Sequence, residues 1–221
     1  LVAYDLRGHG NSGKPWRKED YNLACIWADD IDAVLKATGL KNPIMVGWSR
    51  GGLIAMHYVR CRGADELSAI VMVASRGRLV TVPLPTQEAP SRVSQGQLET
   101  EDIRQNIEGA KKFNSLMTAE ETSVAWNEVA TVMNIMAPPY ARRAMRAPTI
   151  GPSGEMEGSY AGLLDKINVP FTVILGAEDP LRSSQDLAHA YKVAKQDAEI
   201  LIYSDVGHSP FLEAPDRFNQ D

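Results

Sequence analysis

Cysteine is scarce in this 221-residue sequence, which contains only Cys25 and Cys61. Two cysteines exclude a disulfide-rich scaffold and a zinc site built from several cysteines. Both lie in stretches with helical spacing, so we expect them to be buried thiols. Long apolar runs and Lys/Arg clusters are also missing. Their absence excludes a membrane span and argues against a nucleic-acid partner.

The overall composition of the chain is typical of an ordinary globular domain. Hydrophobic residues make up 44% of the chain, charged residues make up 23%, and the formal net charge is −5. Such a chain can bury a sizeable core. No signal peptide is visible, which favours the cytoplasm, although the sequence begins at Leu1 and both ends read as cut. The oligomeric state is left open.

Short apolar runs alternate with longer amphipathic segments along most of the chain. This alternation predicts parallel β-α-β units, and hence an α/β fold with a mostly parallel sheet flanked by helices. Gly39 and Gly63 supply stop signals for two of the helices. The expected strands are residues 1–4, 43–46, 68–74, 171–175 and 199–203, and the expected helices outside the middle of the chain are residues 22–38, 50–62 and 184–195.

The middle of the chain breaks this alternation. Residues 76–162 contain no clear strand, and helical periodicity is visible at residues 100–116 and 119–136. We interpret residues 76–162 as a helical cap inserted into a core made of residues 1–75 and 163–221. A separate small helical domain is the alternative. The resumption of strand–helix alternation after the insertion favours the cap.

The segment from Gly47 to Gly51 reads Gly-Trp-Ser-Arg-Gly, a G-x-S-x-G motif. It follows an expected strand and opens an expected helix, which is the setting of a nucleophile elbow. In this turn a strained backbone would lift the Ser49 hydroxyl above the sheet. Side chains at positions 47 and 51 would clash with neighbouring elements, which explains the two glycines. The alternative is a glycine-rich helix start without chemistry.

A serine nucleophile needs a base, and the base needs an acid to orient it. His208 follows the last expected strand, where α/β sites are built, whereas the other three histidines lie in a turn or within helices. Asp179 directly follows the strand at residues 171–175, with Glu178 as its rival. The predicted set is therefore Ser49, Asp179 and His208.

These motifs together resemble the α/β-hydrolase fold superfamily, in its branch of serine esterases, lactonases and non-haem haloperoxidase-like proteins. The turn Asp-Leu-Arg-Gly-His-Gly-Asn-Ser at residues 5–12 and the Glu-Ala-Pro at residues 213–215 match the family as well. The resemblance implies an upstream strand lying between residues 1–4 and 43–46, so those two should not pair. It also implies that an upstream loop supplies half of the oxyanion hole, which leaves the Arg50 backbone N–H as the donor within this sequence.

We therefore expect a serine hydrolase that cleaves a small or medium carboxylic ester or lactone through an acyl-enzyme, without cofactor or metal. Two alternatives stay open. One is a non-catalytic small-molecule receptor on the same scaffold. The other is a perhydrolase or a carbon–carbon bond hydrolase with the same three residues.

Further residues are candidates for secondary roles. Arg7 and His9 should tie the first turn down by hydrogen bonds. The Arg50 side chain could meet an acidic substrate group, although a salt bridge to a neighbouring carboxylate is the preferred interpretation. Large apolar side chains beside the elbow and in the insertion could line an acyl pocket, because methionine adapts to irregular ligands. The candidates in the insertion are Trp126, Met133, Met136 and Met145, for which packing in the core of the inserted helices is the preferred interpretation. Trp48 is a candidate substrate contact as well, although packing beside the elbow is preferred for it.

Overall fold

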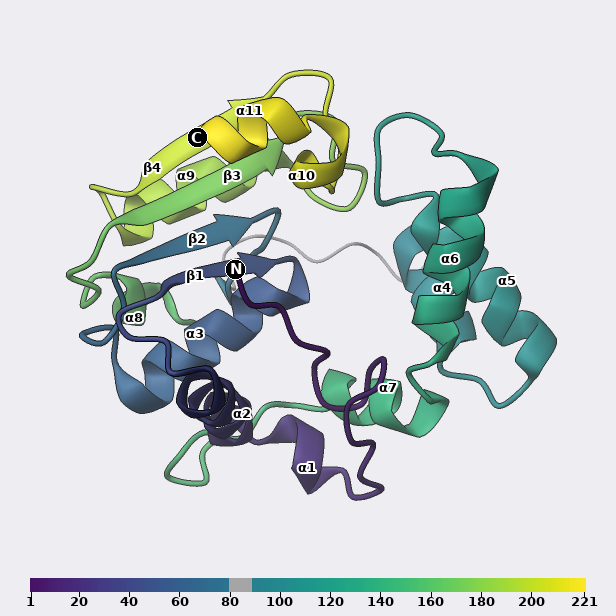
Figure 1. Ribbon diagram of the computed structural model, residues 1–221, viewed down its shortest axis with the longest axis horizontal. Helices are drawn as coiled ribbons and strands as arrows, with labels where there is room; N and C mark the ends of the chain where they lie inside the picture. The colour runs from purple at the N-terminus through teal and green to yellow at the C-terminus, as the bar shows by residue number, and fades with distance from the viewer. Residues whose placement is uncertain (80–88) are drawn as a thin grey trace.

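A four-stranded parallel sheet organises the computed structural model, which describes residues 1–79 and 89–221. The strands lie side by side in chain order and all run the same way (Figure 1). This confirms the predicted fold class. The strands are β1 (Ile44–Trp48), β2 (Ala69–Val73), β3 (Phe171–Gly176) and β4 (Glu199–Tyr203).

Helices fill the connections between the strands. Those in the described part of the predicted insertion, α4 to α8, lie between β2 and β3, and α4, α5 and α6 stand beside the sheet (Figure 1). Residues 80–88 of that insertion lie outside the described residues, and its division from the core stays a prediction. In the described part of the chain, no helix combines the length and apolar character needed to cross a membrane. The helices are α1 (Glu19–Asn22), α2 (Ala24–Thr38), α3 (Arg50–Arg62), α4 (Pro90–Leu98), α5 (Ile103–Asn114), α6 (Val124–Ile135), α7 (Pro139–Arg146), α8 (Ala161–Leu164), α9 (Ser184–Ala194), α10 (Pro210–Glu213) and α11 (Pro215–Gln220).

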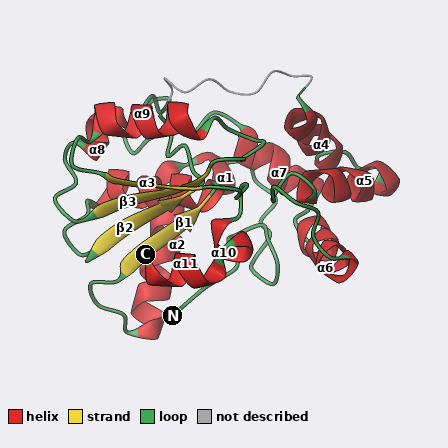
Figure 2. Cartoon of the chain, turned by 90° about the horizontal axis from the view of Figure 1, so that it is seen from above, coloured by secondary structure: helices red, strands yellow, loops and turns green. Residues whose placement is uncertain are grey.

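The core has two parts, one on each face of the sheet. Successive residues of a strand point to opposite faces, so Val173 belongs to one part and Ile174 to the other. The larger part packs β2 and β3 against α2, α3 and α9, and the smaller part lies under α11. Figure 2 shows α9 and α11 on opposite sides of the sheet. This burial on both faces is typical of parallel sheets.

The edge of the sheet at β1 is open on one face. Ile44, Val46 and Trp48, which alternate along β1, are all exposed. The predicted strand at residues 1–4 is wrong, because these residues are neither strand nor buried, and Leu1 is fully exposed. A strand is defined by pairing with a neighbour, and no described segment pairs with this stretch. That residues 1–4 do not pair with β1 agrees with the expectation from the family resemblance.

The expectation that the two cysteines are free thiols is wrong. Cys25 of α2 and Cys61 of α3 form a disulfide across a sequence separation of 36 residues, with the Cα atoms 5.6 Å apart. Helical spacing predicted where each cysteine lies but could not show that α2 and α3 pack side by side. Disulfides persist mainly in oxidising compartments. The cytoplasmic location stays a prediction.

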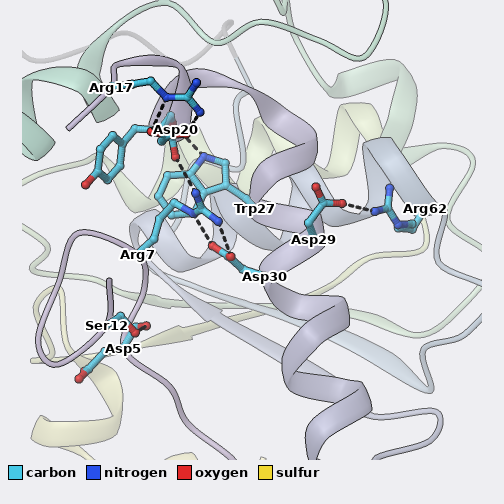
Figure 3. A network of polar contacts seen from close by, with 10 residues as sticks. Asp5, Arg7, Ser12, Arg17, Asp20, Trp27, Asp29, Asp30 and Arg62 are labelled. Carbon is cyan, nitrogen blue, oxygen red and sulfur yellow. Dashed lines mark hydrogen bonds and ion pairs between the residues drawn. The ribbon is translucent and has the colours of Figure 1, made fainter. Parts of the chain in front are cut away.

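The first turn is tied to α2 through Arg7. Its guanidinium donates two hydrogen bonds of 2.6 Å to the Asp30 carboxylate and a third, of 3.1 Å, to the Asp20 carbonyl (Figure 3). Within the turn, Asp5 accepts a hydrogen bond from the Asn11 backbone N–H at 2.8 Å. The predicted anchoring role of Arg7 is confirmed. This anchoring positions the turn that carries His9, which lines the cavity beside Ser49.

Candidate active site

Ser49 lies at the junction of β1 and α3, as the motif predicted. Its backbone has φ 51° and ψ −113°, a conformation that non-glycine residues rarely adopt. The Ser49 N–H donates a 2.8 Å hydrogen bond to the Val73 carbonyl of β2, which holds the turn in this conformation. Such local strain is typical of functional sites, and here Ser49 lines a cavity.

Two glycines permit this turn, Gly47 and Gly52, and only the first of them was predicted. A Cβ on Gly47 would lie 2.6 Å from the Gly52 Cα, which confirms the first. A Cβ on Gly51 would meet nothing within 4 Å, so the predicted clash at Gly51 is wrong. A Cβ on Gly52 would instead lie 2.4 Å from the Ser75 hydroxyl. Gly52 is the residue that allows α3 to approach the end of β2.

The structure brings Ser49, His208 and Asp179 into one hydrogen-bonded row. The Ser49 Oγ lies 2.9 Å from Nε2 of His208, and Nδ1 of His208 lies 2.7 Å from Oδ2 of Asp179. His208 and Asp179 are both buried, and the second Asp179 oxygen accepts a 2.8 Å hydrogen bond from the Leu181 N–H. Glu178, the rival acid, is exposed. The loops that follow β3 and β4 thus bring a carboxylate and an imidazole to the Ser49 hydroxyl after β1.

Trp48 and Glu213 hold the loop that carries His208. The Trp48 indole donates a 2.7 Å hydrogen bond to the His208 carbonyl. The Glu213 carboxylate accepts from the N–H groups of Gly207, at 3.0 Å, and Ser209, at 3.3 Å. It also accepts from Ala119 of the inserted segment at 2.7 Å. The sequence indicated Glu213 only as part of a family motif.

A cavity of about 480 Å³ opens beside the Ser49 hydroxyl. Its walls come from both the sheet side and the inserted helices. Two predicted substrate contacts, Trp48 and Met145, are among its lining residues, together with Ser49, Arg50 and His208. The other three predicted substrate contacts, all on or next to α6, are not among them. They are Trp126, Met133, which is 60% exposed, and Met136, which is 36% exposed. A role for those three in substrate binding stays a prediction.

The Arg50 side chain makes no ion pair with any described carboxylate, contrary to the preferred expectation. It donates one hydrogen bond of 3.2 Å, from Nη1 to the Met145 carbonyl at the end of α7. Burial, and next the nearby Arg146, lower the pKa of the Arg50 guanidinium from its ordinary value. The sequence also did not indicate that His9, Arg142 and Arg146 would line the same cavity, because their approach depends on how α7 packs.

Known proteins resemble this chain along almost its whole length. The AB hydrolase superfamily protein YisY of Bacillus subtilis is 26% identical over 99% of this chain and 78% of its own. The crystal structure of a putative aryl esterase from Burkholderia cenocepacia matches with a TM-score of 0.85 and 29% identity, over 99% of this chain and 76% of its own. Esterase RhEst1 from Rhodococcus sp. ECU1013 matches with a TM-score of 0.81 and 26% identity, over 98% of this chain and 76% of its own.

The chain spans between 64% and 79% of the length of the curated relatives it matches along 99% of its own length. The model of one family, the alpha/beta hydrolase family, matches residues 1–221. That match covers both the sheet and the loops that carry Ser49, Asp179 and His208. The chain belongs to the alpha/beta hydrolase family.

Proposed function

We propose that the protein is a serine hydrolase that cleaves a small or medium carboxylic ester or lactone through an acyl-enzyme. The observation that carries the proposal is the row from Ser49 through His208 to Asp179, with distances of 2.9 and 2.7 Å. These distances lie within the range that a nucleophile, its base and an orienting acid require. Membership of a hydrolase family and two structural neighbours described as esterases support the same reaction class.

In the proposed first step, Ser49 Oγ attacks the carbonyl carbon of the ester while His208 Nε2 takes its proton. Asp179 accepts the Nδ1 hydrogen bond, which fixes the tautomer of His208 and stabilises its charged form. The tetrahedral intermediate collapses as His208 protonates the leaving alcohol oxygen. Water then attacks the acyl-Ser49 ester by the same route, with His208 as base, and releases the carboxylic acid and the free serine.

The developing oxyanion needs hydrogen-bond donors. The Arg50 backbone N–H is the first of α3, and the first N–H groups of a helix have no intrahelical acceptor. The positive end of the α3 dipole favours negative charge at the same place. We assign Arg50 N–H as one donor. Loss of one such donor typically lowers kcat by about 10² to 10³.

A panel of esters and lactones, assayed with the full-length protein, tests this proposal. The panel includes p-nitrophenyl acetate through butyrate and γ- and δ-lactones, and a fluorophosphonate probe is used in parallel. We expect turnover of at least one substrate and a single probe adduct on Ser49, located by peptide mass spectrometry. Absence of both turnover and labelling would instead favour a non-catalytic receptor on a hydrolase scaffold. Peracid formation with hydrogen peroxide, without ester hydrolysis, would indicate a perhydrolase instead. Carbon–carbon cleavage without ester hydrolysis would indicate a carbon–carbon bond hydrolase.

A further inference from the structure

The cavity beside Ser49 is lined by a strong excess of positive charge. Among the described residues that form its walls there is a single acidic one, Glu99, against six arginines. The whole chain carries a formal charge of −5, so this concentration runs against the overall balance of the protein. Enclosing cations is costly unless something neutralises them. The arginines are Arg50, Arg76, Arg78, Arg142, Arg146 and Arg182.

Arg50 stands closest in the chain to the reacting group, directly after Ser49. A guanidinium has five N–H donors, and the described residues occupy one of those of Arg50, through its bond to the Met145 carbonyl. The Arg50 side chain is exposed, although the protein around it lowers the pKa of its guanidinium through desolvation. Both facts agree with a side chain that faces the cavity it lines. Its remaining donors are therefore within reach of a bound molecule.

Arg142 and Arg146 add to the charge on the same side of the cavity. Arg142 donates to the carbonyls of Asn134 and Ala137 and to the Asn134 amide oxygen, none of which carries charge. Burial, and next the charge of Arg50, lower the pKa of Arg142 to about 10. Arg146 pairs with Glu99 at 2.7 Å, and this uses the one carboxylate in the lining. Arg50 and Arg142 thus form no ion pair with a described carboxylate, and Glu99 acts on them only through its charge.

We infer that the substrate is a half-ester of a short dicarboxylic acid, whose free carboxylate pairs with Arg50 while its ester carbonyl lies at Ser49. This inference rests on the proposed function, because it names the substrate class of the same site. A guanidinium binds a carboxylate through two parallel hydrogen bonds, which suits the unused donors of Arg50. Arg142 strengthens the attraction from beside it. The net positive lining also disfavours amine-bearing esters.

Matched methyl esters test the inference with the wild-type protein. Monomethyl glutarate is compared with methyl glutaramate, in which a neutral amide replaces the carboxylate, and with methyl pentanoate. Succinate and adipate sets extend the comparison to other lengths. We expect the carboxylate ester of the best set to have a kcat/KM about tenfold or more above that of its amide partner. Added salt should reduce this preference. Equal or lower kcat/KM for the carboxylate esters in every set would overturn the inference.

Variants then identify the arginine that causes the preference for carboxylate esters. Arg50→Gln should bring the carboxylate-to-amide ratio of kcat/KM close to one, and Arg50→Lys should keep part of the preference. Arg143→Gln is the matched control, because Arg143 lies on the same helix as Arg142 but outside the cavity, where it pairs with Glu101. That variant should retain the full ratio. A folded Arg50→Gln protein with an unchanged ratio would show that Arg50 is not the carboxylate partner.

Binding to Ser49→Ala protein separates this inference from the proposed function. Calorimetric titration with monomethyl glutarate and methyl glutaramate needs no turnover, and we expect about tenfold or more tighter binding of the carboxylate ester. Preferential binding without hydrolysis of any ester by the wild type would refute the proposed function and keep the anion site. Hydrolysis of esters by the wild type without preferential binding would refute the anion site and keep the function.

Discussion

Asp179 and Glu178 are adjacent acids with opposite surroundings. The Asp179 carboxylate is buried against His208, whereas Glu178 is exposed. Asp179→Asn should lower kcat by up to about 10⁴, because an amide cannot hold His208 in the tautomer that accepts the serine proton. Glu178→Gln, the matched control, should change kcat less than about twofold. Steady-state kinetics on the best ester of the panel measures both, and the reverse result would move the acid to Glu178.

Single residues also show what sequence reasoning could predict. The proximity of Ser49, Asp179 and His208 could be predicted because each follows an expected strand, and the carboxyl ends of parallel strands meet at one edge. Their catalytic roles stay a prediction. The arginines of the cavity could not be found this way. Arg142 and Arg146 come from α7, and nothing in their own sequence context indicates which side of a helix meets Arg50. Their position depends on tertiary packing alone.

The two adjacent glycines at the start of α3, Gly51 and Gly52, differ in the space available for a side chain. Gly52→Ala should lower the free energy of unfolding by about 1–3 kcal/mol, because its Cβ would overlap the Ser75 side chain. Gly51→Ala should be neutral or stabilising by up to about 1 kcal/mol, because alanine favours a helix and space is open there. Urea unfolding of both variants measures the difference. A Gly51→Ala variant less stable than Gly52→Ala would refute this account of the elbow.

The α2–α3 pair is joined covalently as well as by packing. Removal of the Cys25–Cys61 disulfide by Cys25→Ser with Cys61→Ser should lower the free energy of unfolding by about 2–4 kcal/mol, since the bond closes a long loop of the unfolded chain. Thermal unfolding with and without reductant measures the loss, and the double variant should not respond to reductant. Two titratable thiols in the unreduced, denatured wild type would contradict the presence of the bond.

Elements with strong local signals were predicted well. The strands β2, β3 and β4 and the helices α2, α3 and α9 agree with the expected ranges within one or two residues. The stretch at residues 1–4 has strand composition but no described partner, and composition alone cannot supply one. Likewise α4 and α7, each with a proline in its first turn, lie in a segment where only two helices were recognised. Their short length leaves too few turns for a clear period.

At the scale of the whole molecule, the buried His57 and the partly buried His9 make the fold sensitive to acid. Burial, then Arg78 and Arg50, lower the pKa of His57 to about 3, and burial, then Arg142, lower that of His9 to about 4. Histidine in an unfolded chain titrates near pH 6.5. Below that pH the unfolded chain binds protons that the folded protein does not, so the stabilising contribution is complete above about pH 6.5 and is lost as the pH falls toward 4 and then 3.

The free energy of unfolding should therefore decrease between about pH 6.5 and 5, at up to about 1.4 kcal/mol per pH unit for each of these histidines. Urea unfolding across this range measures the slope. His57→Gln should reduce the slope, and His189→Gln, at an exposed position, should leave it unchanged. A wild-type stability that is flat over this interval would show that neither histidine is held neutral by the fold.

Ser49 is the proposed nucleophile of an ester hydrolase. This role is tested by the kcat of Ser49→Ala, relative to that of the wild type, on the best ester of the panel. The variant loses only a hydroxyl, so its circular dichroism spectrum and melting temperature should stay close to those of the wild type. We predict a fall in kcat on the scale of about 10⁶, as is seen when a nucleophile of this kind is removed. A folded Ser49→Ala protein that kept more than about a tenth of the wild-type kcat would contradict the account.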